Sequence, residues 1–149
     1  MRGKFSYVGA GIIVVSLGFN EPRYLMLKGV DSGVWSFPKG HPDTVDAGSQ
    51  LRTAVRETYE ETGYSAGREY DIIGNSIRFG KRPYWLGLVR DSVPDARISC
   101  SEHSESAWLT WEEISELNAN TDVRAWVKKA RSPDGAFTRL LSVSRRYVE

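Results

Sequence analysis

The chain has 149 residues, of which 40% are hydrophobic and 26% charged, a composition that suits one soluble globular domain with one core. The chain has 20 Lys and Arg residues and 19 Asp and Glu residues, so its near-zero net charge does not indicate a nucleic acid or a membrane as partner. Cys100 is the single cysteine, which excludes an intramolecular disulfide and is compatible with the cytoplasm. We expect a single domain over 1–149, with a core at about 5–131 and a C-terminal extension at about 132–149.

The N-terminal third predicts strands. The apolar run 8–17 is rich in glycine and β-branched residues and has no small-residue cleavage site after it, so we interpret it as a buried strand and not as a signal peptide; it is also too short to cross a membrane. Residues 12–15 and 24–27 predict two core strands separated by a turn cluster. Residues 34–37 predict a short strand that Pro38 ends.

One amphipathic helix is predicted over 50–62. Ser49 is suited to cap its N-terminus, and Gly63 stands where a left-handed C-terminal cap is needed. The residues that recur at helical spacing are Leu51, Ala54, Val55, Thr58 and Tyr59.

The remainder alternates between the two kinds of element. Strands are predicted around 70–78 and 84–89, a capping box at Thr110 opens a helix through residue 117, and Thr121 is a candidate cap for a helix to about 130. A turn is predicted at 132–135, and the residues after it fit either a further helix or a loose tail. Strands flanking helices predict an α/β (α+β) fold with a mixed sheet between helical layers.

The predicted helix carries three carboxylates on one face. Glu57, Glu60 and Glu61 stand at positions i, i+3 and i+4, where like charges repel each other. Two interpretations are open: a solvated acidic face with an ordinary Arg56–Glu60 pair, or a site for a hard divalent cation such as Mg²⁺. The glycine-rich loop before the helix and Gly63 directly after it favour the cation site.

The run from Arg56 to Tyr64 resembles the second half of the Nudix signature, which reads Arg-Glu, an apolar residue, any residue, Glu-Glu, any residue, Gly, and an apolar residue. Arg56, Gly63 and the three glutamates match its five fixed positions. The resemblance implies a Nudix fold and a Mg²⁺-dependent pyrophosphohydrolase, with Mn²⁺ as a possible substitute. It also implies that Glu57, Glu60, Glu61 and Gly40 make up the metal site and that Arg56 orients the cluster.

The first half of the signature departs from the family pattern. Gly40 matches its opening glycine, but Gly48 occupies the place of a glutamate expected eight residues before the arginine. The loop is also two residues longer than the pattern, and Thr58 replaces a large apolar residue. Either Asp43 or Asp46 is a candidate for the missing carboxylate, and spacing alone leaves both open.

Further stretches resemble one Nudix branch, the asymmetrical diadenosine tetraphosphate hydrolases. Residues 35–41 read Trp-Ser-Phe-Pro-Lys-Gly-His, residues 84–86 read Tyr-Trp-Leu, and Glu102-His103 is followed by Trp108-Leu109. The order and the approximate separations agree with that branch between about residues 9 and 117.

Each of these stretches offers a candidate for the site. Lys39 is a compact cation that could hold a phosphate, and His41 could donate to a phosphate oxygen or a leaving group, or could be a solvated loop histidine. Glu102 is the candidate general base or an extra metal ligand. We expect His103 to be structural.

Residues near the second predicted hairpin are candidates for contacts with the rest of the substrate. Lys81 and Arg82 could meet outer phosphates, or could be a surface charge pair. Phe79 and Tyr84 could stack a nucleobase, although strand aromatics are more often core. We assign three tryptophans to the core or its rim, namely Trp85, Trp108 and Trp111.

These features predict hydrolysis of a phosphoanhydride bond in a nucleoside polyphosphate, with diadenosine tetraphosphate as the leading substrate. Two alternatives keep the chemistry, namely pyrophosphate or cap removal from RNA 5′ ends and hydrolysis of diphosphoinositol phosphates. Arg139, Arg145 and Arg146 are the candidate RNA contacts. An alternative of another class is a non-catalytic nucleotide-binding module. We expect a small-molecule partner, no membrane partner and no obligatory protein partner.

Overall fold

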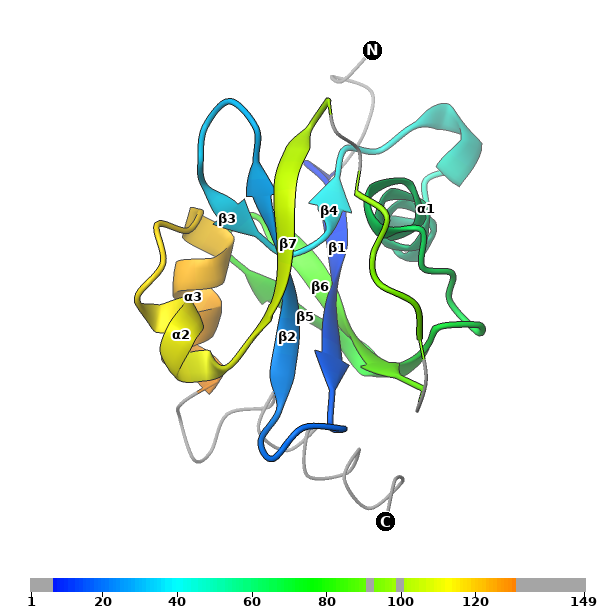
Figure 1. The fold of residues 1–149 in the computed structure, drawn as a ribbon. Helices are drawn as coiled ribbons and strands as arrows, with labels where there is room; N and C mark the ends of the chain where they lie inside the picture. Colours follow the sequence, from blue (N-terminus) through cyan, green and yellow to red (C-terminus); the bar gives the residue numbers. More distant parts are fainter. Residues whose placement is uncertain (1–6, 91–92, 99–100, 131–149) are drawn as a thin grey trace.

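A mixed β-sheet forms the middle layer of the fold (Figure 1). The computed structural model describes residues 7–90, 93–98 and 101–130, so Cys100, the three tail arginines and the predicted turn at 132–135 lie outside the described residues. The strands are β1 (Ala10–Ser16), β2 (Arg23–Gly29), β3 (Trp35–Ser36), β4 (Lys39–Gly40), β5 (Tyr70–Phe79), β6 (Arg82–Val89) and β7 (His103–Leu109). The helical elements are the 3₁₀ turn η2 (Thr44–Asp46), α1 (Gln50–Thr62), α2 (Trp111–Ser115) and α3 (Thr121–Ala130).

The strands follow the order β3-β2-β1-β6-β5, with β4 paired to β1 and β7 paired to β2. β1 and β6 are parallel, whereas the other strand pairs are antiparallel. β1 pairs with β4 at Ala10 and Gly11, and with β2 only at Val15 and Ser16. This change of partner sets β4 beside the start of β1, at the end of the sheet where the candidate site lies.

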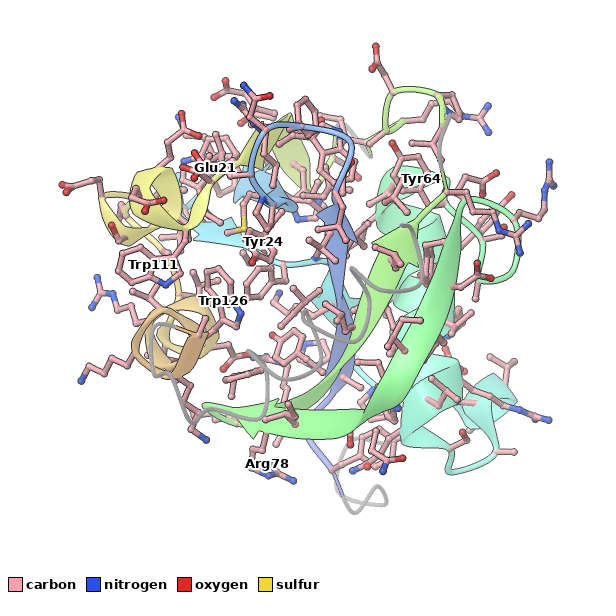
Figure 2. All side chains as sticks on the ribbon, turned by 90° about the horizontal axis from the view of Figure 1, so that it is seen from below. Glu21, Tyr24, Tyr64, Arg78, Trp111 and Trp126 are labelled. Carbon is pink, nitrogen blue, oxygen red and sulfur yellow. The ribbon has the colours of Figure 1, made fainter. Side chains whose placement is uncertain are left out.

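Alternate residues of β1 face two separate cores. Ile12 and Val14 belong to the cluster under α1, and Ile13 and Val15 belong to the cluster under α2 and α3. Figure 2 shows the aromatic rings of Tyr24 and Trp126 together on the α3 side, where their centroids lie 4.7 Å apart, and Tyr64 on the opposite, α1 side. The predicted α/β fold with a mixed sheet between helices is confirmed.

The predicted strands at 12–15, 24–27, 70–78 and 84–89 are confirmed with small changes in their ends, and the helix over 50–62 is confirmed at both ends. The strand predicted over 34–37 is limited to the two residues of β3.

Of the two helix caps predicted after β7, the one at Thr110 is confirmed and the one at Thr121 is not. Thr110 forms the predicted capping box with Glu113, but α2 ends at Ser115 and not at residue 117. The predicted cap at Thr121 is wrong, since Thr121 is already helical and the Asn120 side chain accepts the hydrogen bond from the Val123 amide.

The sequence did not predict β7. The first half of this strand is polar and exposed at Ser104 and Glu105, so it lacks the apolar signal of a core strand. Its register with β2, from Tyr24↔Leu109 to Gly29↔His103, brings His103 to the same end of the sheet as β4. Among the described residues, none of the helices combines the length and apolar character needed to span a membrane.

Candidate active site

Helix α1 is fixed at both ends by the residues that the sequence indicated. The Ser49 hydroxyl accepts a hydrogen bond from the Arg52 amide at 3.2 Å, and Gly63 closes the helix with a φ of 80°. Its buried side differs from the predicted one, because Leu51 and Tyr59 are exposed. Thr58 is fully buried in the place of the family's apolar residue. The buried residues are Thr53, Ala54, Thr58, Glu61 and Thr62.

A cavity of about 630 Å³ opens between α1, β4, the β2–β3 loop and the start of β7. Most of the residues that line it carry polar side chains, and two are valines. The lining residues are Gly29, Val30, Asp31, Ser32, Val34, Ser36, Lys39, Gly40, His41, Glu57, Glu61, Arg82, Ser101, Glu102, His103 and Asn120.

Two of the three helix carboxylates face this cavity. Glu61 is 5% exposed and accepts a hydrogen bond from the Lys39 amide at 3.0 Å. Glu57 lies directly against Gly40, where any Cβ atom would collide with its carboxylate. Glycine at position 40 therefore allows β4 and α1 to approach closely enough for both carboxylates to share the cavity.

Burial dominates the protonation of these two groups. It raises the pKa of Glu61 to about 8, against the opposing effect of the Lys39 amide and ammonium groups. It raises the pKa of Glu57 to about 7, although Arg56 acts in the other direction. Neighbouring carboxylates, Glu60 and Glu102 among them, raise the pKa of Glu57 further. A cation bound beside Glu57 and Glu61 would therefore stabilise the ionised form of both carboxylates.

The start of β7 adds two more potential ligands. One ligand atom from each of Glu61, Glu102 and His103 lies within 4.8 Å of the others. His103 Nε2 is 3.9 Å from Glu61 Oε2, while its buried Nδ1 has no hydrogen-bond partner in the described part of the chain. Burial lowers the pKa of His103, which favours the neutral imidazole that metals bind. Carboxylate oxygens with one imidazole suit a Mg²⁺ or Mn²⁺ ion.

The third helix carboxylate, Glu60, lies beside the cavity and not in its lining. Its side chain is 53% exposed, and both of its carboxylate oxygens accept hydrogen bonds from Arg56 Nη1, at 3.1 and 3.3 Å. In this arrangement Glu60 pairs with the exposed side of Arg56 and does not face the cavity, so the three glutamates do not occupy equivalent positions.

Asp46 occupies the place of the missing signature carboxylate. Arg56 Nε donates to its Oδ1 at 2.9 Å and Arg56 Nη2 to its Oδ2 at 3.0 Å, a bidentate pair in a carboxylate that is 2% exposed. The Thr53 hydroxyl and the Asp43 amide also donate to Oδ2. The hydrogen bonds from Arg56 lower the pKa of Asp46 to about 2. Asp43 has another task, since it caps the 3₁₀ turn η2.

The loop insertion follows Asp46. Asp46 stands six residues after Gly40, the interval that the family pattern gives to its glutamate, so the two extra residues fall between Asp46 and α1. Ala47 and Gly48 both adopt positive φ values, 53° and 77°. These two left-handed residues form the turn that takes up the insertion, and Asp46 still contacts Arg56.

Three further predicted residues reach the cavity. Lys39, His41 and Arg82 all line it. The His41 carbonyl accepts a hydrogen bond from Arg56 Nη2 at 2.9 Å, so the loop that carries the histidine is tied to α1.

Three other predicted residues do not line the cavity. Lys81 lies exposed in the β5–β6 turn. Phe79 and Tyr84 are 1% and 2% exposed within the core under α3, which agrees with the alternative that these strand aromatics belong to the core. The assignment of Trp85, Trp108 and Trp111 to the core rim is confirmed, since all three are partly buried and pack on the two clusters.

Sequence reasoning missed part of the site. It expected His103 to be structural and did not foresee its place beside Glu61 and Glu102, and it left the choice between Asp43 and Asp46 open. It also missed Asp122, which lies 38–41 residues from its partners on β6 and the preceding turn. The interval between Gly40 and Asp46 was the available signal for Asp46, whereas nothing local marks Asp122.

Comparisons with known proteins agree with this geometry. The NUDIX domain family matches residues 8–130. The asymmetrical bis(5'-nucleosyl)-tetraphosphatase of Sus scrofa is 36% identical over 99 residues, covering 61% of this chain and 65% of the relative. The enzyme of that name from Mus musculus is 34% identical over 117 residues, covering 72% of this chain and 77% of the relative. The chain thus spans about two thirds to three quarters of the length of these curated relatives.

Solved structures show the same fold. A C. elegans Ap4A hydrolase in a binary complex has a TM-score of 0.71 at 20% identity, covering 90% of this chain and 98% of the other. The Nudix hydrolase RenU from M. Smegmatis has a TM-score of 0.65 at 15% identity, covering 84% and 83%. The resemblance to the Nudix family and its diadenosine tetraphosphate branch, and the expected enzyme class, a Nudix pyrophosphohydrolase, are confirmed. The chain belongs to the Nudix family.

Proposed function

We propose that the chain hydrolyses a phosphoanhydride bond in a dinucleoside polyphosphate, with diadenosine tetraphosphate as the preferred substrate, and that the reaction depends on Mg²⁺. One observation carries this proposal, namely that three acidic and two basic residues line a single cavity. They are Glu57, Glu61, Glu102, Lys39 and Arg82. Carboxylates suit the metal and the cations suit the phosphate chain. The names of the curated relatives support the choice of substrate.

The proposed ligands are Glu57 and Glu61, completed by Glu102, directly before β7, or by His103, its first residue. Gly40, whose main chain lies against Glu57, belongs to the proposed set. Glu60 would join it by turning from Arg56 towards Glu57, whose pKa it already raises. A divalent cation bound here would neutralise phosphate charge and favour ionisation of a bound water.

The remaining residues position substrate and move protons. Lys39 and Arg82 line the cavity and hold phosphate oxygens in this proposal, and His41, which also lines it, donates to the leaving group. Glu102 is exposed at the rim, and its carbonyl accepts a hydrogen bond from the Val30 amide at 2.9 Å, which fixes the main chain beside the cavity. Its carboxylate is our candidate for the base that takes a proton from the attacking water.

Arg56 has a positioning role in this proposal. It joins Asp46, Glu60 and the His41 carbonyl, so it fixes α1 relative to the loop that leads into it. A non-catalytic binding module would need neither two largely buried carboxylates in one cavity, of which only Glu57 lies near a guanidinium at 3.7 Å, nor a replacement for the signature glutamate.

A product assay tests the proposal. The chain would be incubated with Mg²⁺ in ¹⁸O-labelled water with diadenosine tetraphosphate, a nucleoside triphosphate, capped RNA or a diphosphoinositol phosphate. We expect diadenosine tetraphosphate to give a nucleoside triphosphate and a monophosphate, with ¹⁸O in only one of them and no reaction after chelation of the metal. Cleavage into two diphosphates would refute the expected position of attack, and faster turnover of RNA or diphosphoinositol phosphate would refute the substrate assignment. No cleavage of any substrate would support the binding module.

A further inference from the structure

A buried carboxylate on α3 lies behind one wall of the cavity. Asp122, in the first turn of α3, is fully buried. Its Oδ2 accepts hydrogen bonds from the Tyr84 hydroxyl at 2.5 Å and Arg82 Nη1 at 2.9 Å, and its Oδ1 accepts one from the Lys81 amide at 3.2 Å. The carboxylate therefore joins α3 to the start of β6 and to the turn before it.

Arg82 is the one member of this network that also lines the cavity. Its side chain is 17% exposed, and its Nη1 is held by Asp122. Its Nε is buried without a hydrogen-bond partner in the described part of the chain and packs against Gly9, where a Cβ atom would come within 3.2 Å. One side of the guanidinium is thus fixed, which leaves donors on the planar fork for a ligand.

We infer that Asp122 is a positioning residue, which holds Arg82 in the orientation that receives the outer phosphates of the substrate. This inference rests on the proposed function. Tyr84 and Lys81 already donate to both oxygens of Asp122, and the ion pair with Arg82 compensates the charges of both partners, so it serves the arginine as much as the aspartate. A guanidinium held in advance loses less side-chain entropy when it binds an anion than a free one does.

The charges of the pair fit this role. Asp122 compensates the positive charge of a mostly buried arginine, and three donors converge on its two oxygens. An asparagine at this position would set an NH₂ group against one of these donors in either orientation of its amide. In every orientation the amide also lacks the negative charge that pairs with the guanidinium, so Asp122→Asn should loosen the fixed orientation of Arg82 with little change in side-chain volume.

A double-mutant cycle tests the inference, with Asp122→Asn, Arg82→Ala and the double variant. We expect KM to rise about tenfold in each single variant, since a hydrogen bond to a charged group is lost, while kcat changes less. In the double variant KM should match that of Arg82→Ala, because Asp122 acts through the arginine. Asp71→Asn is the matched control, since Asp71 forms an exposed pair with Arg90 on the same hairpin, outside the cavity lining.

Calorimetric titration of the same variants with inorganic tripolyphosphate at fixed Mg²⁺ separates this inference from the proposed function. The affinity for tripolyphosphate should follow the same cycle even if no nucleotide is hydrolysed. A normal KM and normal tripolyphosphate affinity in Asp122→Asn, or additive effects in the double variant, would overturn the positioning role.

Should Asp122→Asn fail to fold, Gly80→Ala disturbs the same carboxylate from outside, because the new Cβ would collide with Asp122 Oδ1. The same rise in KM is expected there, and an unchanged KM would overturn the role.

Discussion

Asp46 and Glu61 are both buried carboxylates at helix α1, yet their surroundings shift their pKa values in opposite directions. Asp46 receives two hydrogen bonds from Arg56 and one each from Thr53 and Asp43, and its pKa falls to about 2. Glu61 receives one from the Lys39 amide, and burial raises its pKa to about 8. Asp46 has a cation within the fold, so we assign it a structural role. Glu61 lacks such a partner and would be stabilised by a bound cation, so we assign it a functional role.

The largest expected effect is on turnover. Glu61→Gln should lower kcat about a thousandfold, because metal-based stabilisation of the transition state contributes several kcal/mol. The glutamine keeps the shape and the acceptor for the Lys39 amide. Without metal at pH 8 it should also raise the free energy of unfolding, because the neutral side chain has no charge to desolvate. Steady-state kinetics and urea unfolding measure the two effects.

Glu105→Gln provides the control for that variant, since Glu105 is an exposed glutamate on β7 paired with Lys28. It should keep the wild-type kcat. A Glu61→Gln enzyme with near-wild-type kcat would mean that Glu61 is a structural carboxylate like Asp46.

The second effect is on stability. Asp46→Asn should lower the free energy of unfolding by about 3 kcal/mol, because it leaves Arg56 without the partner of its bidentate pair. The folded-state pKa of Asp46 lies below its ordinary value of 3.8, so this part of the stability is fully present above about pH 4. It is lost as the pH falls through about 2, a change of about 2 kcal/mol that the Asn variant should lack.

Urea unfolding between pH 2 and pH 7 would measure this effect. Asp43→Asn is the matched control, because Asp43 is an exposed cap of η2 without a hydrogen bond to Arg56 among the described contacts. It should cost less than Asp46→Asn. An equal or larger loss in the Asp43 variant would mean that the two aspartates were assigned in the wrong order.

The smallest effect concerns substrate binding by the two predicted lysines. Lys39 lines the cavity beside Glu61, whereas Lys81 lies outside its lining. Lys39→Ala should raise KM about tenfold through loss of a charged contact to phosphate, and Lys81→Ala less than about twofold. Steady-state kinetics with diadenosine tetraphosphate compares the pair. Equal effects would show that the phosphate chain extends beyond the cavity to the β5–β6 turn.

The sequence predicted the elements whose signals are local. Helix α1 carries its own caps at Ser49 and Gly63, and the apolar runs of β1 and β2 mark core strands. It could not predict β7, because the strand begins with polar residues and gains its place by pairing with β2. Long-range contacts such as those of Asp122 depend on how β5, β6 and α3 pack, which no local pattern contains.

Anomalous X-ray scattering from a crystal soaked in Mn²⁺ at pH 8 tests the central claim most directly, namely that Glu57 and Glu61 lack a sufficient cation of their own and bind a divalent ion. We predict a peak within about 2.2 Å of an oxygen of each carboxylate, the distance expected for direct coordination. At pH 5, where both carboxyl groups are protonated in the metal-free protein, the peak should weaken. An ordered ion bound only at Asp46 or Glu60, or no ion between the two carboxylates at pH 8, would contradict the account.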